Sequence, residues 1–170
     1  VFPANFPNPI AQAIKKYYSE NLENNHMIIK TKNIYNLKGK KDLTLFINFE
    51  KTNNFRQVNK FHEIVNLILI PNGIYCSCAE TINQRSDRKW KKSRFFLGPI
   101  VLFIDFLYKR VIPKLPFTKQ IYFALTRGHN RVMSKTEILG RLVSCGFESL
   151  EIIKHENLSY IISKKVRTPL

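Results

Sequence analysis

The sequence predicts an α/β fold with a parallel sheet at its centre, and three observations carry that prediction. First, two nearly continuous apolar runs, LTLFINF at 43–49 and IYCSCAE at 74–80, are typical of strands buried on both faces. Second, a helical apolar stripe and a Pro-Asn-Gly turn separate these runs, so the two strands are expected to be parallel neighbours. Third, alternating runs flank residues 155–157 near the end of the chain and predict an antiparallel hairpin.

The remaining elements follow from capping residues and periodicity. Asn8 and Pro9 predict the cap and first residue of a helix near the start of the chain. Ser134 and Glu137 have the spacing of a capping box at the start of another helix, which Gly146 ends. Three further elements are expected: a short strand at 27–31, a helix at about 54–69 and a helix at about 118–126.

The charge of the chain is unusual, although its length and apolar content fit one folded domain spanning residues 1–170. Lys and Arg total 28 against 12 Asp and Glu, which gives a formal net charge of +16. Such an excess repels itself in a compact state, so it favours an anionic partner: nucleic acid, anionic lipid headgroups or a phosphorylated substrate. The alternative is compositional bias from an AT-rich genome. The opening VFPANFPNP has no initiator Met, so we expect a piece of a longer protein.

The cysteines and acidic residues predict neither a metal site nor a catalytic centre. Cys76, Cys78 and Cys145 are too few for a disulfide framework, which fits a reducing cytoplasm. Cys76 and Cys78 would face the same side of a strand, but no His or acidic residue lies at ligand spacing from them. No set of nucleophile, base and orienting residue can be recognised, so no catalytic residue is assigned.

Two segments resemble the second half of the class I methyltransferase fold. They are IPNGIYCSCAE at 70–80 and the terminal FESLEIIKHENLSYIISKK at 147–165. The resemblance implies a partial Rossmann-like parallel sheet with an antiparallel C-terminal hairpin and helices on both faces. Such enzymes need a Gly-rich turn after the first strand, yet no two of the six glycines here fall within three residues of each other. We therefore expect no cofactor, and S-adenosylmethionine (SAM) binding is not expected.

A second resemblance covers about residues 43–169. The strings KRVIPKLP, TRGHNRVMSK and LGRLVSCGFE are similar to the region that precedes the catalytic domain in Bacteroidetes-type bacterial sugar transferases. Those enzymes move a sugar-1-phosphate onto a polyprenyl-phosphate carrier in exopolysaccharide or O-antigen assembly. The resemblance implies a non-catalytic accessory domain, cytoplasmic and peripheral to the inner membrane, whose partner is a C-terminal catalytic domain. The alternatives are a methyltransferase fragment without its cofactor-binding half and a nucleic-acid-binding module.

A cluster of cations surrounds the single tryptophan, and it suits a membrane surface. Lys and Arg beside Trp are typical of a bilayer interface, where the indole lies at headgroup level. The alternatives are a solvated helix face and, less favoured, nucleic acid, because no aromatic residues are interleaved as a stacking platform. The predicted membrane-surface residues are Arg85, Arg88, Lys89, Trp90, Lys91, Lys92 and Arg94.

The stretch RFFLGPIVLFIDFLYKRVIPKLPF at 94–117 predicts a helix that is apolar nearly all round. It belongs to a basic and apolar helical insertion at 80–117. With Asp105 inside and Lys109 near its end, it is too short to span a bilayer. It therefore packs in the core, lies in a membrane interface or forms a homodimer through residues 95–112.

A second group of cations lies around the start of the helix that Ser134 caps. Free N–H groups and the helix dipole favour a phosphate at such a start. The predicted anion-binding residues are Arg127, His129, Arg131, Ser134 and Lys135. The alternative is a surface loop with an ordinary helix cap. His62 and His155 have no evident partners and are interpreted as structural or solvated.

Overall fold

A computed structural model describes residues 6–18, 25–92, 98–112, 115, 116, 118, 120, 124, 126 and 129–169. Its helices are α1 (Asn8–Tyr17), η1 (Ile34–Leu37), η2 (Thr52–Asn54), α2 (Val58–Ile68), α3 (Ile82–Lys92), α4 (Gly98–Phe106), η3 (Leu107–Val111) and α6 (Lys135–Ser144). Its strands are β1 (His26–Ile29), β2 (Leu43–Lys51), β3 (Leu69–Ala79), β4 (Phe147–His155) and β5 (Leu158–Lys165).

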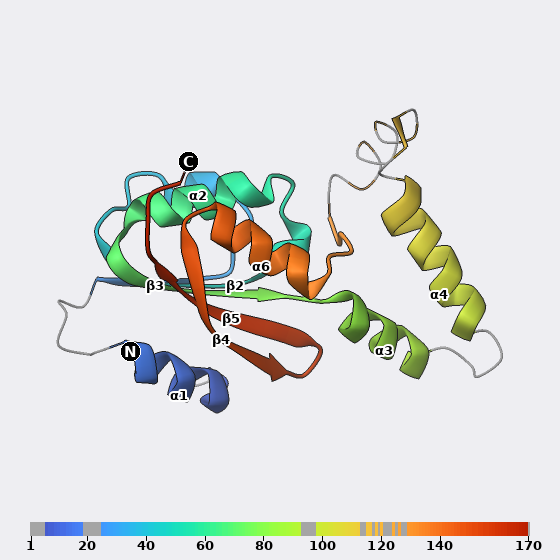
Figure 1. Ribbon diagram of the computed structural model, residues 1–170, viewed down its shortest axis with the longest axis horizontal. Coiled ribbons are helices and arrows are strands. Elements are labelled where there is room, and N and C mark those ends of the chain that lie inside the picture. Colours follow the sequence, from blue (N-terminus) through green and yellow to red (C-terminus); the bar gives the residue numbers. More distant parts are fainter. Residues whose placement is uncertain are drawn as a thin grey trace.

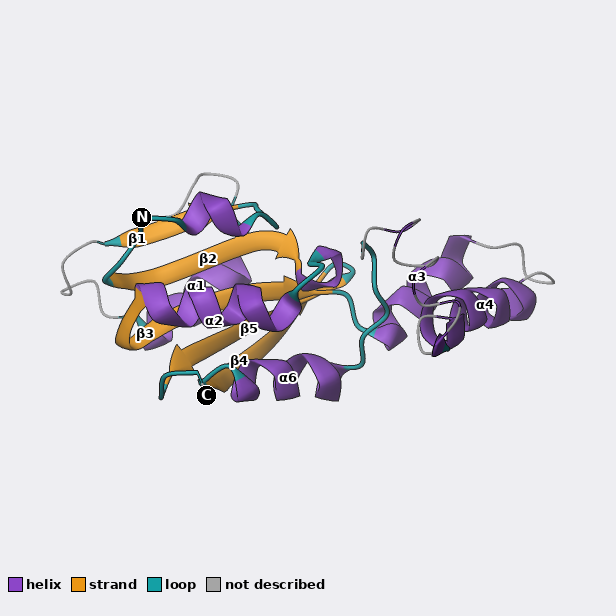
Figure 2. Ribbon diagram, turned by 90° about the horizontal axis from the view of Figure 1, so that it is seen from above, coloured by secondary structure: helices purple, strands orange, loops and turns teal. Residues whose placement is uncertain are grey.

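The five strands form one mixed sheet in the order β1-β2-β3-β5-β4 (Figures 1 and 2). β1, β2 and β3 are parallel, and Phe46 of β2 pairs with Tyr75 of β3. β5 runs antiparallel to both β3 and β4, so the terminal hairpin lies beside the parallel strands. The predicted α/β class, the parallel crossover and the antiparallel hairpin are confirmed.

Helices cover both faces of this sheet, as predicted. On one face Phe46 and Tyr75 pack beneath α2 and α6; on the other, Leu45 and Ile74 face α1 (Figure 1). Each of these four strand side chains is at most 3% exposed. The apolar run at 43–49 is therefore continuous because both sides of the strand lie in a core.

Two helices begin at other residues than predicted. The helix expected from residue 54 begins at Val58, because residues 52–54 form a separate 3₁₀ turn. Asn8 is the first helical residue, and Pro7 occupies the cap position without a side-chain hydrogen bond. At the other capped helix, the Ser134 hydroxyl accepts from the Glu137 amide at 3.1 Å, as predicted. The helix expected at 118–126 lies largely outside the described residues.

The predicted turn at Pro71–Gly73 lies inside the bounds of β3, which begins at Leu69 directly after α2. Gly73 is required there by a close approach of two backbones. An added Cβ would lie 3.0 Å from the Ile70 carbonyl oxygen and 3.2 Å from that of Leu43. Asn72 adopts a left-handed conformation with φ of 62°, which Asn tolerates better than most residues.

α3, α4 and η3 extend to one side of the sheet, beyond the ends of the parallel strands (Figures 1 and 2). We call these three helices the helical arm. The arm lies within the insertion predicted at 80–117, and it continues directly from the end of β3 through Glu80 and Thr81.

Candidate functional site

The carboxyl ends of the three parallel strands bring four polar segments together. Residues 30–33 follow β1, residues 52–54 follow β2 and residues 80–81 follow β3. Residues 129–131 follow the helical arm in the sequence. They join the other three segments through hydrogen bonds to Asn53 and Asn54. In open α/β sheets, ligands bind in the crevices outside this edge, so we take it as the candidate site.

Asn53 holds this edge together. Its side-chain amide donates to the carbonyl oxygens of Glu80 and Arg131, both at 2.8 Å, and accepts from the Glu80 amide at 2.7 Å. The Arg131 amide also donates to the Asn53 carbonyl at 2.9 Å. The side chain is 1% exposed, so these bonds replace water completely. One buried amide thus fixes the end of β3 against the segment that precedes α6.

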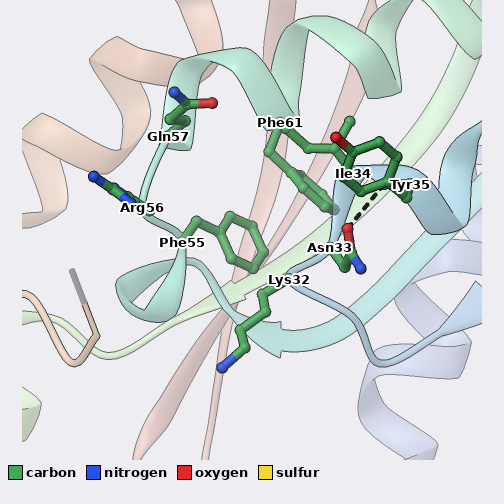
Figure 3. A pocket seen from close by; sticks show the side chains of 8 residues that line it. All are labelled: Lys32, Asn33, Ile34, Tyr35, Phe55, Arg56, Gln57 and Phe61. Carbon is green, nitrogen blue, oxygen red and sulfur yellow. Dashed lines mark hydrogen bonds between the residues drawn. The ribbon is translucent and has the colours of Figure 1, made fainter. Parts of the chain in front are cut away.

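A hollow of about 280 Å³ lies between the segments that follow β1 and β2, and we call it the Tyr35 hollow (Figure 3). Phe55 and Phe61 form its apolar wall, with ring centroids 4.3 Å apart. Tyr35 stands at its rim and is 81% exposed. The other lining residues are Lys32, Asn33, Ile34, Arg56 and Gln57. The hollow therefore combines aromatic surface with amide and cationic groups.

The turn after β1 is held by side-chain hydrogen bonds. The Thr31 amide donates to Asn48 Oδ1 at 3.0 Å, and Asn48 Nδ2 donates to the Thr31 carbonyl at 2.8 Å. Asn33 Oδ1 accepts from the Tyr35 amide at 3.0 Å, which starts η1 (Figure 3). Lys32 reaches across the edge, and its Nζ lies 3.2 Å from His129 Nε2. Side-chain hydrogen bonds thus fix the turn that forms one side of the Tyr35 hollow.

A second hollow, of about 410 Å³, opens on the other side of the β2 end, and we call it the Glu80 hollow. The Glu80 side chain is 2% exposed and accepts two hydrogen bonds from Arg88, at 2.6 and 3.1 Å. Arg85 and Lys51 add positive charge within 4 Å of the same carboxylate. The other lining residues are Lys30, Phe49, Glu50, Asn54, Asn157 and Leu158.

Within the helical arm, the carboxylate of Asp105 attaches α4 to α3. Arg85 donates to both Asp105 oxygens, at 2.8 and 3.0 Å, and Lys89 Nζ lies 2.5 Å from one of them. Partial burial raises the pKa of Asp105, but the hydrogen bonds and charges of Arg85 and Lys89 outweigh it and lower the pKa to about 2. Asp105 is therefore ionised at neutral pH, and α4 is attached to α3 by charge.

The five predicted anion-binding residues do not form one group in the described part of the chain. His129 lies beside Lys32 at the carboxyl edge, and the Arg131 backbone binds Asn53. Ser134 and Lys135 line a different hollow, of about 320 Å³, at the start of α6. The Ser134 hydroxyl already caps the helix. Arg127 lies outside the described residues, and anion binding by this set stays a prediction.

The predicted membrane-surface cations differ in their surroundings. Arg85 is 6% exposed and binds Asp105 and Asn130, so this side chain lies inside the protein, contrary to the surface position expected of it. Arg88 and Lys89 are partly buried in the ion pairs described above. Lys91 is exposed and Trp90 is 45% exposed. The Lys92 side chain and Arg94 lie outside the described residues.

His62 lies in the core, in agreement with its structural interpretation. Its Nδ1 lies 3.2 Å from the Tyr75 hydroxyl, and the ring is fully buried among aromatic neighbours. Burial, helped by the positive charge of Arg141, lowers the pKa of His62 to about 3. Burial likewise raises the pKa of Cys78 to about 12. No three His, Cys, Asp or Glu side chains of the described ranges gather as a metal site.

Sequence patterns missed the residues that build the carboxyl edge. Asn53 binds Glu80, 27 positions away, and Lys32 lies beside His129, 97 positions away, so no local period reveals these contacts. The available signal was positional: the polar residues of EKTNNF directly follow a strand buried on both faces. Side chains at that place lie at the carboxyl edge of a parallel sheet.

Comparison with known proteins gives the fold. No family model matches the chain, and no curated protein matches it. A Listeria monocytogenes structure described as a candidate S-adenosylmethionine-dependent methyltransferase aligns with 92% of this chain and 74% of its own, at 12% identity and a TM-score of 0.51. The chain therefore has a Rossmann-like fold of the kind found in SAM-dependent methyltransferases.

Two other similar structures are much longer than this chain. A Bordetella parapertussis protein described as a possible exported protein matches 81% of this chain and 43% of its own, with 13% identity and a TM-score of 0.45. An O-methyltransferase family protein from Burkholderia thailandensis matches 80% and 34%, with 12% identity and a TM-score of 0.43. The chain thus spans less than half of either protein.

The comparison corrects one prediction. The glycine argument led us to expect no cofactor and no SAM binding, whereas the chain shares its fold over 92% of its length with a protein described as SAM-dependent. Separately, none of the described helices has both the length and the apolar character that crossing a bilayer requires.

Proposed function

We propose that this chain is a methyltransferase-type domain that binds SAM, or its product S-adenosylhomocysteine (SAH), in the Tyr35 hollow. The observation that carries the proposal is the place of the hollow, between the segments that follow β1 and β2. Two parallel neighbouring strands end there, and in this class of fold nucleoside ligands bind outside the carboxyl ends of such strands.

The walls of the hollow suit the adenosine part of the ligand. Adenine is a flat ring with two broad apolar faces and a polar edge. Phe55, Phe61 and the exposed ring of Tyr35 are the groups that would hold those faces. The side-chain amides of Asn33 and Gln57 are the groups that would meet the polar edge. Pockets of this kind combine mostly apolar walls with a few placed polar groups.

Lys32 suits the charged end of the ligand. The methionine part of SAM carries a carboxylate, and Lys32 lines the hollow, with its ammonium directed toward His129 at the same edge of the sheet. When bound, SAM supplies an electrophilic methyl group. The residues of this chain would bind and orient it, and the Thr31–Asn48 hydrogen bonds keep the turn that carries Lys32 in one conformation.

Calorimetric titration of SAM and SAH into the chain tests this proposal. We expect saturable binding of one equivalent, weakened about tenfold by Tyr35→Ala, because stacking of a base on an aromatic ring contributes about 1–3 kcal/mol. Val143→Ala, on α6 and 54% exposed, is the matched control and should leave the affinity unchanged. Absence of saturable binding for both ligands, or equal weakening by both variants, contradicts the proposal.

We also propose a second role, as the accessory domain of a membrane-associated sugar-1-phosphate transferase at the inner membrane. The resemblance of the sequence strings motivates it, and the helical arm supports it, since Phe103 and Ile104 of α4 are 62% and 58% exposed. Sequencing the gene beyond the codon for Leu170 tests the proposal. A sugar-transferase catalytic domain in the same reading frame is expected, and an unrelated domain there would contradict the role.

A further inference from the structure

The helical arm exposes more apolar surface than a solvated helix tolerates. Its large apolar side chains between residues 100 and 108 are exposed by 38–62%: Ile100, Val101, Phe103, Ile104, Phe106, Leu107 and Tyr108. At about 100° per residue, these side chains cover more than half of the helix circumference. Contiguous apolar surface of this kind marks an interaction site. We call these seven residues the α4 face.

The opposite side of α4 is already occupied. Leu102 and Asp105 are the partly buried positions of the helix, and Asp105 is held by Arg85 and Lys89 of α3. The only acidic side chain of α4 is thus neutralised and turned toward α3. The α4 face therefore carries no negative charge, because the one carboxylate of α4 lies on the other side of the helix.

The length of the helix decides how it meets an apolar phase. Residues 98–111 form 14 residues of continuous helix, α4 followed by the π-helical η3. That is about 21 Å, against a hydrocarbon core of about 30 Å. A helix of this length lies along an interface and buries one face at the level of the headgroups and upper acyl chains.

Charge favours a bilayer over a second copy of the chain. The protein carries a formal net charge of +16, so two copies repel each other, whereas an anionic surface attracts each copy. α3, which supports the α4 face, carries Trp90 and the exposed Lys91 in its last turn. Trp and Lys are the residues that favour the interface between headgroups and acyl chains. Each cation near an anionic leaflet contributes about 1 kcal/mol.

We propose that the α4 face docks the protein onto the surface of an anionic phospholipid bilayer, with α4 lying in the interface. The apolar side chains of the α4 face enter the bilayer interface, and the positive charge of the protein attracts it to the negative headgroups. Docking therefore needs both the α4 face and an anionic surface. This surface is separate from the Tyr35 hollow, and the inference holds whether or not SAM binds.

Vesicle flotation of the whole 170-residue chain tests the inference. We expect flotation with vesicles of phosphatidylcholine and phosphatidylglycerol at 7:3, and at least tenfold less binding to phosphatidylcholine alone. Trp90 is the only tryptophan, so a blue shift of its emission on binding reports the arm without a label. Phe103→Glu should lower binding at least tenfold; Leu67→Glu, on α2 and similarly exposed at 64%, should not.

Three outcomes overturn the inference. The first is no flotation with the anionic vesicles. The second is equal loss of binding in Phe103→Glu and Leu67→Glu, which would show that added negative charge, and not the α4 face, matters. The third is a dimer in sedimentation equilibrium that Phe103→Glu abolishes while vesicle binding is absent, which would assign the α4 face to a second copy. Circular dichroism of both variants confirms that the fold is retained.

Discussion

The sheet and the helical arm differ in what holds them in place. In the sheet, Phe46 and Tyr75 are completely buried and their rings are 5.7 Å apart, so apolar packing sets the structure. In the arm, ion pairs of Asp105 with Arg85 and Lys89 attach α4 to α3, and most of the apolar side chains of α4 are exposed. The sheet therefore buries its apolar side chains, whereas the arm partly buries its charged side chains and exposes its apolar ones.

Because of this difference, the sheet and the helical arm should respond differently to salt. Apolar packing responds weakly to salt, whereas ion pairs that are partly exposed to water are screened by it. The charged groups Glu80 and Arg88 join the arm to the carboxyl edge, so conditions that loosen the arm also reach the Glu80 hollow. Changes in the core should instead affect the whole fold at once.

Replacement of Asn53 should give the largest loss of stability. Asn53→Ala leaves the Glu80 amide and two carbonyl groups without their buried partner. We expect a loss of about 3–5 kcal/mol in the free energy of unfolding, measured by urea denaturation. Asn83→Ala, at an exposed position on α3, should change it by less than about 0.5 kcal/mol. Equal effects of the two variants would contradict the claim that Asn53 holds the carboxyl edge together.

His62 should make the core sensitive to acid. The folded-state pKa of about 3 lies below the ordinary value of 6.5, so the unfolded chain binds a proton first as pH falls. The stability that depends on neutral His62 is complete above pH 6.5 and is lost toward pH 3. The slope approaches about 1.4 kcal/mol per pH unit in that window. His62→Gln should reduce the slope by this amount, and an unchanged slope would contradict a buried neutral imidazole.

Asp105 should make the arm sensitive to a lower range of pH. Its pKa is about 2 in the folded protein against an ordinary 3.8, so its stabilising effect is present above about pH 4 and is lost as pH falls toward 2. Asp105→Asn should lower the free energy of local opening of α4 by about 2 kcal/mol, since Arg85 and Lys89 lose their shared partner. Hydrogen exchange of amides 98–112 measures this. Asp87→Asn, at an exposed position of α3, is the control; similar exchange in the two variants would contradict pinning by Asp105.

Ser134 should give the smallest of these effects. Ser134→Ala removes the hydroxyl that accepts from the Glu137 amide and caps α6. We expect a loss of about 1 kcal/mol in thermal or urea unfolding. Ser134→Asp keeps an acceptor at the cap and should restore most of it. If Ser134→Asp is as unstable as Ser134→Ala, the cap does not stabilise α6.

Local patterns were sufficient to predict single elements of the fold. The apolar run at 43–49, the stripe that became α2 and the terminal hairpin are each encoded in a short window, because strand and helix periods repeat every two to four residues. The capping pair of Ser134 and Glu137 is also local, with a spacing of three residues.

Contacts between distant segments could not be predicted in this way. Arg85 was expected on a surface because it belongs to a basic run, yet it binds Asp105, twenty positions away. The Tyr35 hollow needs residues 32–35 and 55–61, which meet only because β1 and β2 pair in parallel. The SAM prediction failed for a related reason, since it took the absence of one local motif as evidence against a cofactor.

A titration of SAH into the ¹⁵N-labelled chain, followed by amide chemical shifts, tests the central claim most directly. If the carboxyl edge binds the cofactor, the amides of residues 32–35 and 55–57 shift and saturate together, while those of 98–108 on the arm stay in place. If no amide at the edge shifts with saturation, or if the shifts are confined to the arm, the Tyr35 hollow is not a SAM site.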